Sequence, residues 1–543
     1  MAAAAAQKSV AAPHVRRPRA EIGGSRPAYS AASNVDQNIA LWQPNLRSAD
    51  AEIMRDAAKV RARARDLERN HPYARQAIRI SRLGVVGKKL RYSCRPDYRF
   101  LGIDFEEATR WGQEFERLWE QYAHGPGFYI DAGRRMSFSQ LIGLAHDRDF
   151  VDGESLTTGE WRKARSKWQT CFQAVDIDRL SNPNGWPESL YLKGGVMLGE
   201  LSEPLGYYIR DSHPADIALL GARTTTWTFA RRETDWGRTV AMHSYDVGRA
   251  GQTRGISEFA SVIRDMKMGR EYTETALAGA ILQASYAAVM VSQQNYKDAL
   301  EIIAASPPGA DGAAPSLADV ALENLEAAIE YHEEAQIRFN GAKVPILFPG
   351  EDLKLLTPGH SANTLADFQS QATKAYAAGT GTDPISVSQD YSDVNYSSAK
   401  MAVASNWRSY EARRERLLGT VAVPMVRNFL EEVVHSGAMP LPKGVQPIDF
   451  YDALDALITG KFITAGAPML DPVKERQGQK LGLEIGAETL QDICAEEGKD
   501  YLEVLDQQQR EKMEREARGL PPPSPLMLPP MPAETEGAPN DKG

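Results

Sequence analysis

Residues 251–291 read GQTRGISEFASVIRDMKMGREYTETALAGAILQASYAAVMV, and this stretch predicts the central helix of the fold. After Gly255 the apolar residues recur mainly every three or four positions, as on one face of an α-helix. Small residues dominate the second half, which lets a neighbouring backbone approach closely. We therefore expect a helix of about forty residues that is packed on one side. Its apolar positions include Ile256, Phe259, Ile263, Met266, Ala276, Leu277, Ala280, Ile281, Ala284, Ala288 and Val289.

The same stretch holds the most apolar run of the chain, residues 276–291. That run is shorter than the roughly 20 residues that a membrane span needs. It also contains the polar residues Gln283, Ser285 and Tyr286, and charged residues flank it on both sides. We therefore expect a helix buried against protein, with no membrane partner.

Downstream of this stretch, residues 304–315 form a loop rich in Pro, Gly and Ala. A second helix is expected from Ser316 to about Asn340, so that the two helices make a hairpin. Short strands over 344–348 and 353–356 and a helix over 364–377 follow.

The polar segment 390–398 then leads into a very long helix that runs from Ala399 to about His435. Pro424 lies inside that helix and should kink it. Residues of about 450–518 read as helical and acidic, and the Pro-rich end as a disordered tail.

Upstream, helices are expected over 48–70, over 73–83 with Gly84 as its end, over 104–122 and over 138–150. The third carries an aromatic stripe that we expect to be buried: Phe105, Trp111, Phe115, Leu118, Trp119 and Tyr122. Residues 154–250 contain short strand-like runs between turns. The fold class is therefore α+β and predominantly helical.

The charge of the chain argues against a protein that coats nucleic acid, because 63 Lys and Arg face 72 Asp and Glu, a net charge of −9. The three cysteines lie far apart and form no metal motif. Residues 47–99 are the exception to this acidity, with about fifteen basic and six acidic side chains. Two readings of this segment stay open, a solvated helix face or a contact with DNA or an acidic neighbouring subunit.

No convincing catalytic, cofactor-binding or metal site is found in the sequence. Gly84-Val85-Val86-Gly87-Lys88 has too few residues between its glycines for a phosphate loop. One acidic cluster has the density of a metal site, formed by Asp147, Asp149 and Glu154 with Asp152 nearby. It supports the alternative of a metal-dependent nucleic-acid enzyme, although turn carboxylates explain it as well.

Several segments, taken in their order, resemble the portal proteins of tailed bacteriophages, specifically the lambda-type portal family. The resemblance covers roughly residues 45–520, and GQTRGISEFASVI (251–263) is its most specific part. It is also carried by ARDLERNHPYARQAIRISRLGVVGKKLR (64–91), GRRMSFSQLIGLAHDRDFVDGESL (133–156) and QDYSDVNYSSAKMAVASNWRSYEARRERL (389–417).

The resemblance implies a ring-shaped homo-oligomer, typically a dodecamer, at one vertex of the virion capsid, assembled in the host cytoplasm. Double-stranded DNA would pass through its channel during packaging and ejection. The implied protein partners are the terminase large subunit, the major capsid or scaffold protein and head-tail connector proteins. No enzymatic activity and no cofactor are implied.

The resemblance also implies which residues form the wing, stem, clip and crown of the family. Residues 1–45 would be a flexible N-terminal arm, 46–255 the wing, 256–296 the first stem helix, 297–315 the clip loop and 316–340 the second stem helix. Residues 341–398 would add wing and tunnel loop, 399–518 the long helix and crown, and 519–543 the disordered tail.

Two sets of site residues follow from this assignment. The tunnel loop would present Asp390, Tyr391, Ser392, Asp393, Asn395, Tyr396 and Ser397 to DNA. Subunit packing in the stem would use the small residues Ala276, Ala280, Ala284 and Ala288.

Overall fold

The computed structural model describes residues 30–34, 36–163, 167–216, 226–286, 362–392, 396–447, 450–464, 471–497 and 499–520. It also describes residue 466 and a few residues between 323 and 344. The chain divides into two compact units, Met1–Ser48 and Ala49–Gly543. The described part of the first unit contains the 3-10 helix η1 (Ser30–Ala32). The elements below belong to the second unit.

The two helices expected at the start of this unit are α1 (Ala49–Asn70) and α2 (Pro72–Val85). His71 separates them, and its ring accepts a hydrogen bond from the backbone N–H of Ala74. Gly84 does not end α2 as we expected, because the helix continues to Val85. A Cβ at Gly84 would lie 2.3 Å from Cδ2 of Tyr410. The glycine is therefore needed for close packing and not for termination.

The aromatic stripe lies on α4 (Phe105–His124), between the short α3 (Tyr98–Leu101) and α5 (Phe138–Asp152). Its members Trp111, Phe115, Trp119 and Tyr122 are buried, as expected. Phe105 was expected to be buried too, but it is exposed at the first position of the helix and packs on the ring of Tyr98. Burial of each large side chain contributes roughly 1.5–3 kcal/mol, so this stripe is the main anchor of α4.

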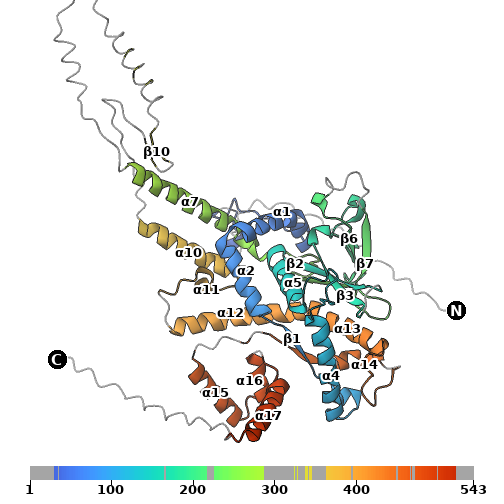
Figure 1. The fold of residues 1–543 in the computed structure, drawn as a ribbon. Coiled ribbons are helices and arrows are strands. Elements are labelled where there is room, and N and C mark those ends of the chain that lie inside the picture. Colours follow the sequence, from blue (N-terminus) through green and yellow to red (C-terminus); the bar gives the residue numbers. More distant parts are fainter. Residues whose placement is uncertain are drawn as a thin grey trace, which may run out of the picture. The chain divides into compact units, whose positions relative to one another are not determined.

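The β-rich region expected over 154–250 is confirmed as two antiparallel sheets (Figure 1). The first has the strand order β3-β2-β8 and the second the order β4-β5-β6-β7. The strands are β2 (Glu154–Trp161), β3 (Thr170–Val175), β4 (Leu192–Lys193), β5 (Val196–Leu198), β6 (Pro204–Arg210), β7 (Trp227–Arg231) and β8 (Ala241–Tyr245). The connections include the 3-10 helices η2 (Ile177–Arg179), η3 (Pro183–Gly185) and η4 (Pro214–Asp216). Leu156, Val196 and Tyr207 pack in one core cluster that joins the two sheets.

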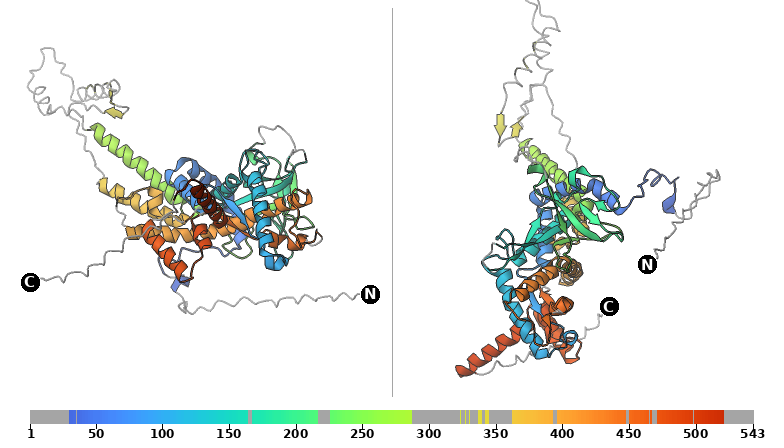
Figure 2. Two further views of the ribbon diagram at one scale, coloured as in Figure 1. Left: turned by 60° about the horizontal axis from the view of Figure 1, so that its bottom comes forward. Right: turned by 90° about the vertical axis from the view of Figure 1, so that its right-hand side faces the viewer.

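The central helix is α7 (Ile263–Tyr286), which follows the 3-10 helix η5 (Glu258–Ser261). It packs on α10 (Ala362–Thr380), and the two run side by side in Figures 1 and 2. The hydroxyl of Tyr376 donates to the backbone oxygen of Asp265 at 3.1 Å, and the rings of Tyr272 and Phe368 lie 4.4 Å apart. The remainder of the forty-residue helix that we expected lies outside the described residues.

The second helix of the expected hairpin, over 316–340, does not reach Asn340. Ile337–Phe339 forms strand β9, which pairs antiparallel with β10 (Ala342–Val344). We expected Gly341 to end this helix, but Asn-Gly is also the preferred sequence of a two-residue β-hairpin turn. The expected strand over 344–348 begins earlier and is described only as far as Val344, and the expected strand over 353–356 lies outside the described residues.

The expected long helix consists of α12 (Tyr396–Leu417), the π-helix η6 (Leu418–Ala422) and α13 (Val423–His435). Pro424 was expected to kink this helix, and the structure has the π turn just before it. Proline has no N–H to donate and its ring clashes with the carbonyl four residues earlier, so the wider turn relieves both problems.

The C-terminal elements are α14 (Phe450–Leu457), β11 (Gly460–Ile463), α15 (Pro472–Glu484), α16 (Leu490–Glu496) and α17 (Tyr501–Ala517). Strand β11 pairs antiparallel with β1 (Arg91–Cys94), so the C-terminal region is hydrogen-bonded to a strand near the start of the unit. The described part of the chain contains no helix that is both long and apolar enough to cross a membrane. The architecture is mostly helical with some sheet, as expected of the α+β class.

Candidate functional site

The polar segment that follows α11 (Pro384–Ser388) is an exposed turn. Gln389 ends the helix in the left-handed conformation, with φ of 57°, and its N–H donates to the backbone oxygen of Ile385 at 2.7 Å. Oδ1 of Asp390 accepts hydrogen bonds from the N–H and the hydroxyl of Ser392, at 3.0 and 2.6 Å. These bonds lower the pKa of Asp390, so its carboxylate is charged at neutral pH. Tyr391 beside it is 66% exposed.

The other residues expected in this loop are only partly described. Tyr396 and Ser397 form the first turn of the α12 backbone, so α12 begins three residues earlier than we expected. Asp393 and Asn395 lie outside the described residues.

Helix α11 holds this turn against α2. The side chain of Asp383 caps α11 by accepting from the N–H of Ser386 at 2.6 Å. Nε2 of Gln76 on α2 donates to the backbone oxygen of Ser386 at 3.4 Å. Val387 is buried in the same apolar cluster as Ile78 of α2. The exposed turn therefore rests on a packed support.

Arg413 on α12 joins four elements at the end of α10, the helix that precedes α11 in the chain. Its guanidinium donates to the backbone oxygen of Thr380 at 3.0 Å and to the hydroxyl of Ser81 at 3.2 Å. It also lies 3.3 Å from a carboxylate oxygen of Glu258 and 5.2 Å from the ring centre of Phe150. The end of α10, the helices α2 and α5 and the helix η5 are thus all in contact with one side chain.

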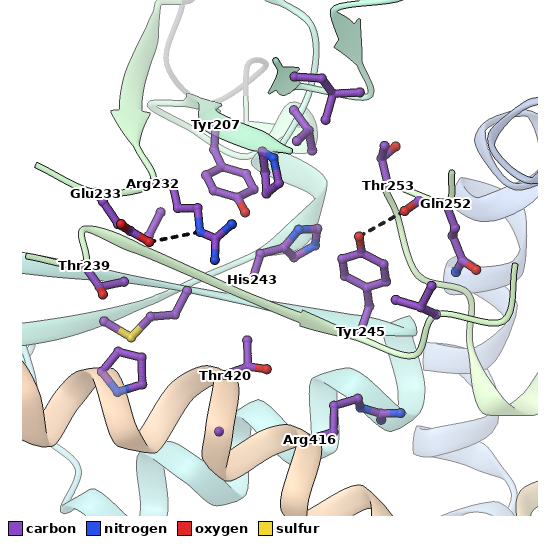
Figure 3. Close-up of a pocket in the computed structure, with 18 of the residues that line it drawn as sticks. Tyr207, Arg232, Glu233, Thr239, His243, Tyr245, Gln252, Thr253, Arg416 and Thr420 are labelled. Carbon is purple, nitrogen blue, oxygen red and sulfur yellow. Dashed lines mark hydrogen bonds and ion pairs between the residues drawn. The ribbon is translucent and has the colours of Figure 1, made fainter. Parts of the chain in front are cut away.

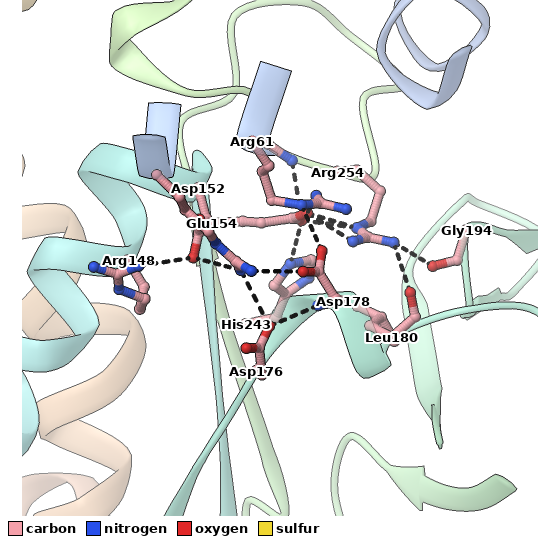
Figure 4. A network of polar contacts seen from close by, with 12 residues as sticks. Arg61, Arg148, Asp152, Glu154, Asp176, Asp178, Leu180, Gly194, His243 and Arg254 are labelled. Carbon is pink, nitrogen blue, oxygen red and sulfur yellow. Dashed lines mark hydrogen bonds and ion pairs between the residues drawn. The ribbon is translucent and has the colours of Figure 1, made fainter. Parts of the chain in front are cut away.

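A second polar centre lies around Glu154 at the start of β2 (Figure 4). Arg254 binds both carboxylate oxygens, with Nη2 at 2.7 Å and Nε at 2.8 and 3.0 Å. Arg61 and His243 add contacts at 3.2 and 2.9 Å. Burial by itself would raise the pKa of Glu154, but the charges of Arg254 and His243 outweigh it and hold the pKa well below its usual range.

The segment that contains Arg254 is fixed on both sides before α7 begins. The N–H and the hydroxyl of Thr253 donate to Oδ1 of Asp50 on α1, at 2.8 and 3.1 Å. The N–H of Gly255 donates to Glu154 at 3.1 Å. A Cβ at Gly255 would lie 1.9 Å from the backbone oxygen of Gly153, so only glycine allows these two backbone segments to approach each other.

Part of the basic segment 47–99 is neutralised inside the molecule. Arg65 contacts Asp152, Asp176 and Asp178 at 2.7, 3.1 and 2.6 Å. Arg61 adds a contact to Asp178 at 2.9 Å. The acids come from the region of residues 147–178, so the sequence of the basic segment alone gave no sign of this pairing. These arginines form neither a solvated helix face nor a free contact surface for DNA or a neighbouring subunit, because their partners are carboxylates of the same chain.

The acidic cluster of the alternative reading does not form a metal site. Oδ2 of Asp147 lies 2.9 Å from Nη1 of Arg82, and Glu154 is held by Arg254. Oδ2 of Asp149 accepts from the hydroxyl of Ser244 at 2.7 Å. Each carboxylate thus points to a different protein partner, and the metal-dependent enzyme is not supported.

Within the described ranges, one group brings three possible metal ligands together, namely Asp176, Asp178 and His213. Asp178 already lies 2.9 Å from Arg61 and 2.6 Å from Arg65, and His213 lies 3.4 Å from Asp178. Two guanidinium groups occupy the place of a cation, so this group is an ion-pair network.

A polar cavity of about 700 Å³ lies between β8, β6 and the π-helix η6 (Figure 3). Tyr207, His243 and Tyr245 line it from the strands, and Thr420 lines it from η6. Arg416 lies 2.8 Å from Asp246, and the hydroxyl of Tyr245 donates to the backbone oxygen of Gln252 at 3.1 Å. These groups are already engaged with protein partners.

The alanines expected in subunit packing lie on the second half of α7. Ala276 is half-buried and Ala280 is exposed, while Leu277 and Ile281 beside them are 61% and 51% exposed. Within this chain the helix is therefore not buried here, in contrast to our expectation. Ala284 lies on the described backbone of α7, and Ala288 lies outside the described residues.

Comparison with known proteins assigns the chain to a family. The profile described as "Phage portal protein, lambda family" matches residues 36–414. The portal protein of Escherichia phage N15 is 32% identical over 484 residues, which cover 89% of each chain. Portal protein B of Escherichia phage lambda is 32% identical over 500 residues, which cover 91% of each chain. Among solved structures, a chain from the neck of an empty gene transfer agent (GTA) particle aligns with 90% of this chain and 100% of its own length, at 14% identity and a TM-score of 0.41. The family match and the two phage relatives show that the chain belongs to the lambda family of phage portal proteins.

Proposed function

We propose that this portal protein assembles into a ring, typically a dodecamer, at one vertex of the capsid, and that double-stranded DNA passes through the axial channel during packaging and ejection. The family membership supports this function. The structural observation that carries it is the exposed acidic turn at Asp390–Ser392, which follows α11 where that helix packs on α2.

The segment 390–397, which begins with this turn, is proposed as the part of the channel wall that contacts DNA. Wall cations that neutralise phosphates release counterions and strengthen binding, which would resist translocation. Asp390 is charged at neutral pH and exposed, so it repels the phosphate backbone. Tyr391 and Ser392 offer neutral polar contacts that read no sequence. Such a surface suits a duplex that has to slide.

Helix α7 is proposed as the first stem helix, with a neighbouring subunit covering the face that this chain leaves open. Leu277 and Ile281 are exposed on it, next to the small residues Ala276 and Ala280. Contact with a second backbone would remove apolar surface from water at about 25 cal/mol per Å².

The remaining assignments are part of the same proposal. The arm would be residues 1–45, the wing 46–255, the clip 297–315, the second stem helix 316–340, and the crown would follow the long helix. Terminase, capsid or scaffold protein and head-tail connector proteins would dock on the outer faces of the ring. The chain would act without catalysis of its own, in the virion, after assembly in the host cytoplasm.

Negative-stain electron microscopy of the purified protein tests the ring. We expect closed rings with an axial hole wide enough for a duplex, and a compact monomer at all concentrations would refute the proposal. Deletion of residues 390–397 should leave the rings intact and impair DNA packaging or retention. Normal DNA packaging and retention by the deletion variant would refute the proposed role of the turn.

Substitution Ala280→Trp tests the packing face of α7, because the indole would separate the two backbones. We expect smaller assemblies in size-exclusion chromatography. The matched control is Gly279→Ala, which adds a single methyl group one residue away, where no atom lies within 4 Å. An unchanged elution profile for Ala280→Trp would show that this face is not an interface.

A further inference from the structure

The helices α1, α2 and α5 border a groove of about 980 Å³ on the surface. Its cationic side chains are all arginines, and no lysine lines it. They are Arg65, Arg69, Arg75, Arg79, Arg82 and Arg148. The groove thus gathers five arginines of the basic segment 47–99, together with Arg148 from α5.

The carboxylates of the groove are already paired with its arginines. Asp147 lies 2.9 Å from Arg82, and Glu68 lies 2.7 Å from Arg148. The third, Asp176, lies 3.1 Å from Arg65. Six guanidinium groups against three carboxylates leave the groove with a net charge of +3.

Three arginines carry this excess. Arg75 and Arg79 are exposed on α2, and their side chains contact no hydrogen-bond or ion-pair partner in the part of the chain that the structure describes. They are four residues apart, so they lie about 6 Å from each other along the helix axis. Arg69 on α1 has a 3.9 Å contact with Asp66 in which both side chains are largely exposed, and such pairs contribute about 0–1 kcal/mol.

We propose that this groove binds the sugar-phosphate backbone of double-stranded DNA. Guanidinium groups bind phosphate oxygens with two parallel hydrogen bonds, which a row of arginines can repeat along a strand. Among the described residues, the apolar side chains that line the groove are Ile78 and Leu83, and none of these residues offers an aromatic ring to stack on unpaired bases. The groove therefore suits a paired duplex and a contact that is independent of sequence.

An acidic peptide fits these walls less well. Its three main walls are helices, whose backbone N–H and C=O groups bond within the helix, so these walls offer no strand edge to an extended chain; the segment after β3 adds the single residue Asp176. A duplex needs no backbone partner, because its phosphates are bound by the side chains alone.

The inference rests on the proposed function for its source of DNA and adds a second contact to it. The turn at Asp390 is acidic and suits sliding, whereas this groove is basic and would retain a duplex. Added salt should therefore weaken the attraction between DNA and the groove, whereas it should weaken the repulsion between DNA and the turn. Three uncompensated arginines would neutralise about two or three phosphates, with a salt slope of about 0.9 for each one.

The test uses the purified full-length protein and a labelled duplex of mixed sequence, with binding followed by fluorescence anisotropy. The variant is Arg75→Gln with Arg79→Gln. The matched control is Lys59→Gln with Arg63→Gln, which removes the same charge from exposed positions of α1 that do not line the groove. Affinities are measured between about 50 and about 200 mM salt, where phosphate contacts dominate.

We expect the groove variant to bind the duplex roughly tenfold more weakly than the wild type. The slope of its log affinity against log salt concentration should fall by about 2. The control variant should keep both the affinity and the slope of the wild type. An unchanged slope, or an equal loss in the control, would overturn the proposal. A groove variant with an unchanged slope but smaller assemblies by light scattering would assign the groove to an acidic neighbouring subunit instead. Because the duplex assay reads binding in any assembly state, its failure is distinct from a failure to form rings.

Discussion

Nη2 of Arg254 lies 2.7 Å from Oε1 of Glu154, and the two side chains are 6% and 0% exposed. This buried pair joins the segment that precedes α7 to the start of β2, one hundred residues earlier in the chain. Arg61 brings α1 to the same carboxylate. The segment before α7, the start of β2, α1 and, through His243, β8 therefore share one buried anion.

Substitution Glu154→Gln should destabilise the fold strongly. The amide keeps the shape of the side chain but leaves Arg254 buried without a counter-charge, which costs about 3–5 kcal/mol, whereas Arg61 keeps its contact with Asp178. We expect a lower free energy of unfolding in urea. The control Glu120→Gln breaks the exposed pair with Lys89 and should cost at most about 1 kcal/mol. Equal effects of the two substitutions would contradict the role of the buried anion.

Asp149 should make the stability depend on pH. Burial raises its pKa to about 7 against the opposing effects of Ser244 and Arg416, whereas the unfolded carboxyl titrates near the ordinary value of 3.8. The folded state holds the extra proton between these values, so this contribution is present at low pH and is lost as the pH rises through about 7.

The variant Asp149→Asn cannot titrate, so it isolates this contribution. We expect the melting temperature of the wild type, relative to that of Asp149→Asn, to fall between about pH 4 and about pH 7 and to level off above that. If the melting temperatures of the two proteins change in parallel with pH over this range, Asp149 does not control the pH dependence of stability.

Arg413→Lys tests the support of the exposed turn. Lysine keeps the charge but cannot reach Thr380, Ser81 and Glu258 together, so a buried hydrogen bond is lost at a cost of roughly 1–3 kcal/mol. We expect faster proteolytic cleavage within residues 389–398. Arg408→Lys, an exposed position on the same helix, is the control and should leave the cleavage rate unchanged.

Gly84→Ala separates helix propensity from packing. In an open helix alanine is favoured over glycine by about 1 kcal/mol, but here its methyl group would meet the ring of Tyr410. Overpacking costs about 1–3 kcal/mol, so we expect a net loss of stability. Gly478→Ala in α15 has no atom within 4 Å of the new methyl and should be neutral or stabilising. A gain at both sites would contradict the close contact of α2 and α12.

Much of the local structure could be predicted from the sequence. The helix α7 and the buried stripe of α4 follow from spacings of three and four residues, because one face of a helix meets the core. The interruption near Pro424 follows from a missing N–H, which is a property of one residue. These features need no knowledge of distant partners.

The errors arose where one residue type serves two purposes. Gly84 read as a helix end, but it makes room for Tyr410, which is more than three hundred residues away. Gly341 read as a helix stop, although the strands β9 and β10 lie on either side of it in the sequence. Local sequence allowed both uses, and only the surrounding structure selected one of them.

For the functional residues, the sequence by itself determined the polar segment at 390–398, the small-residue face of α7 and the excess of positive charge in 47–99. Only the tertiary structure decided which of those charges remain free. Arg61 and Arg65 meet carboxylates from a distant region and are neutralised, whereas Arg75 and Arg79 face outward. The physical reason is that an ion pair depends on distance in space, and the folding of β2 and η2 against α1 sets that distance.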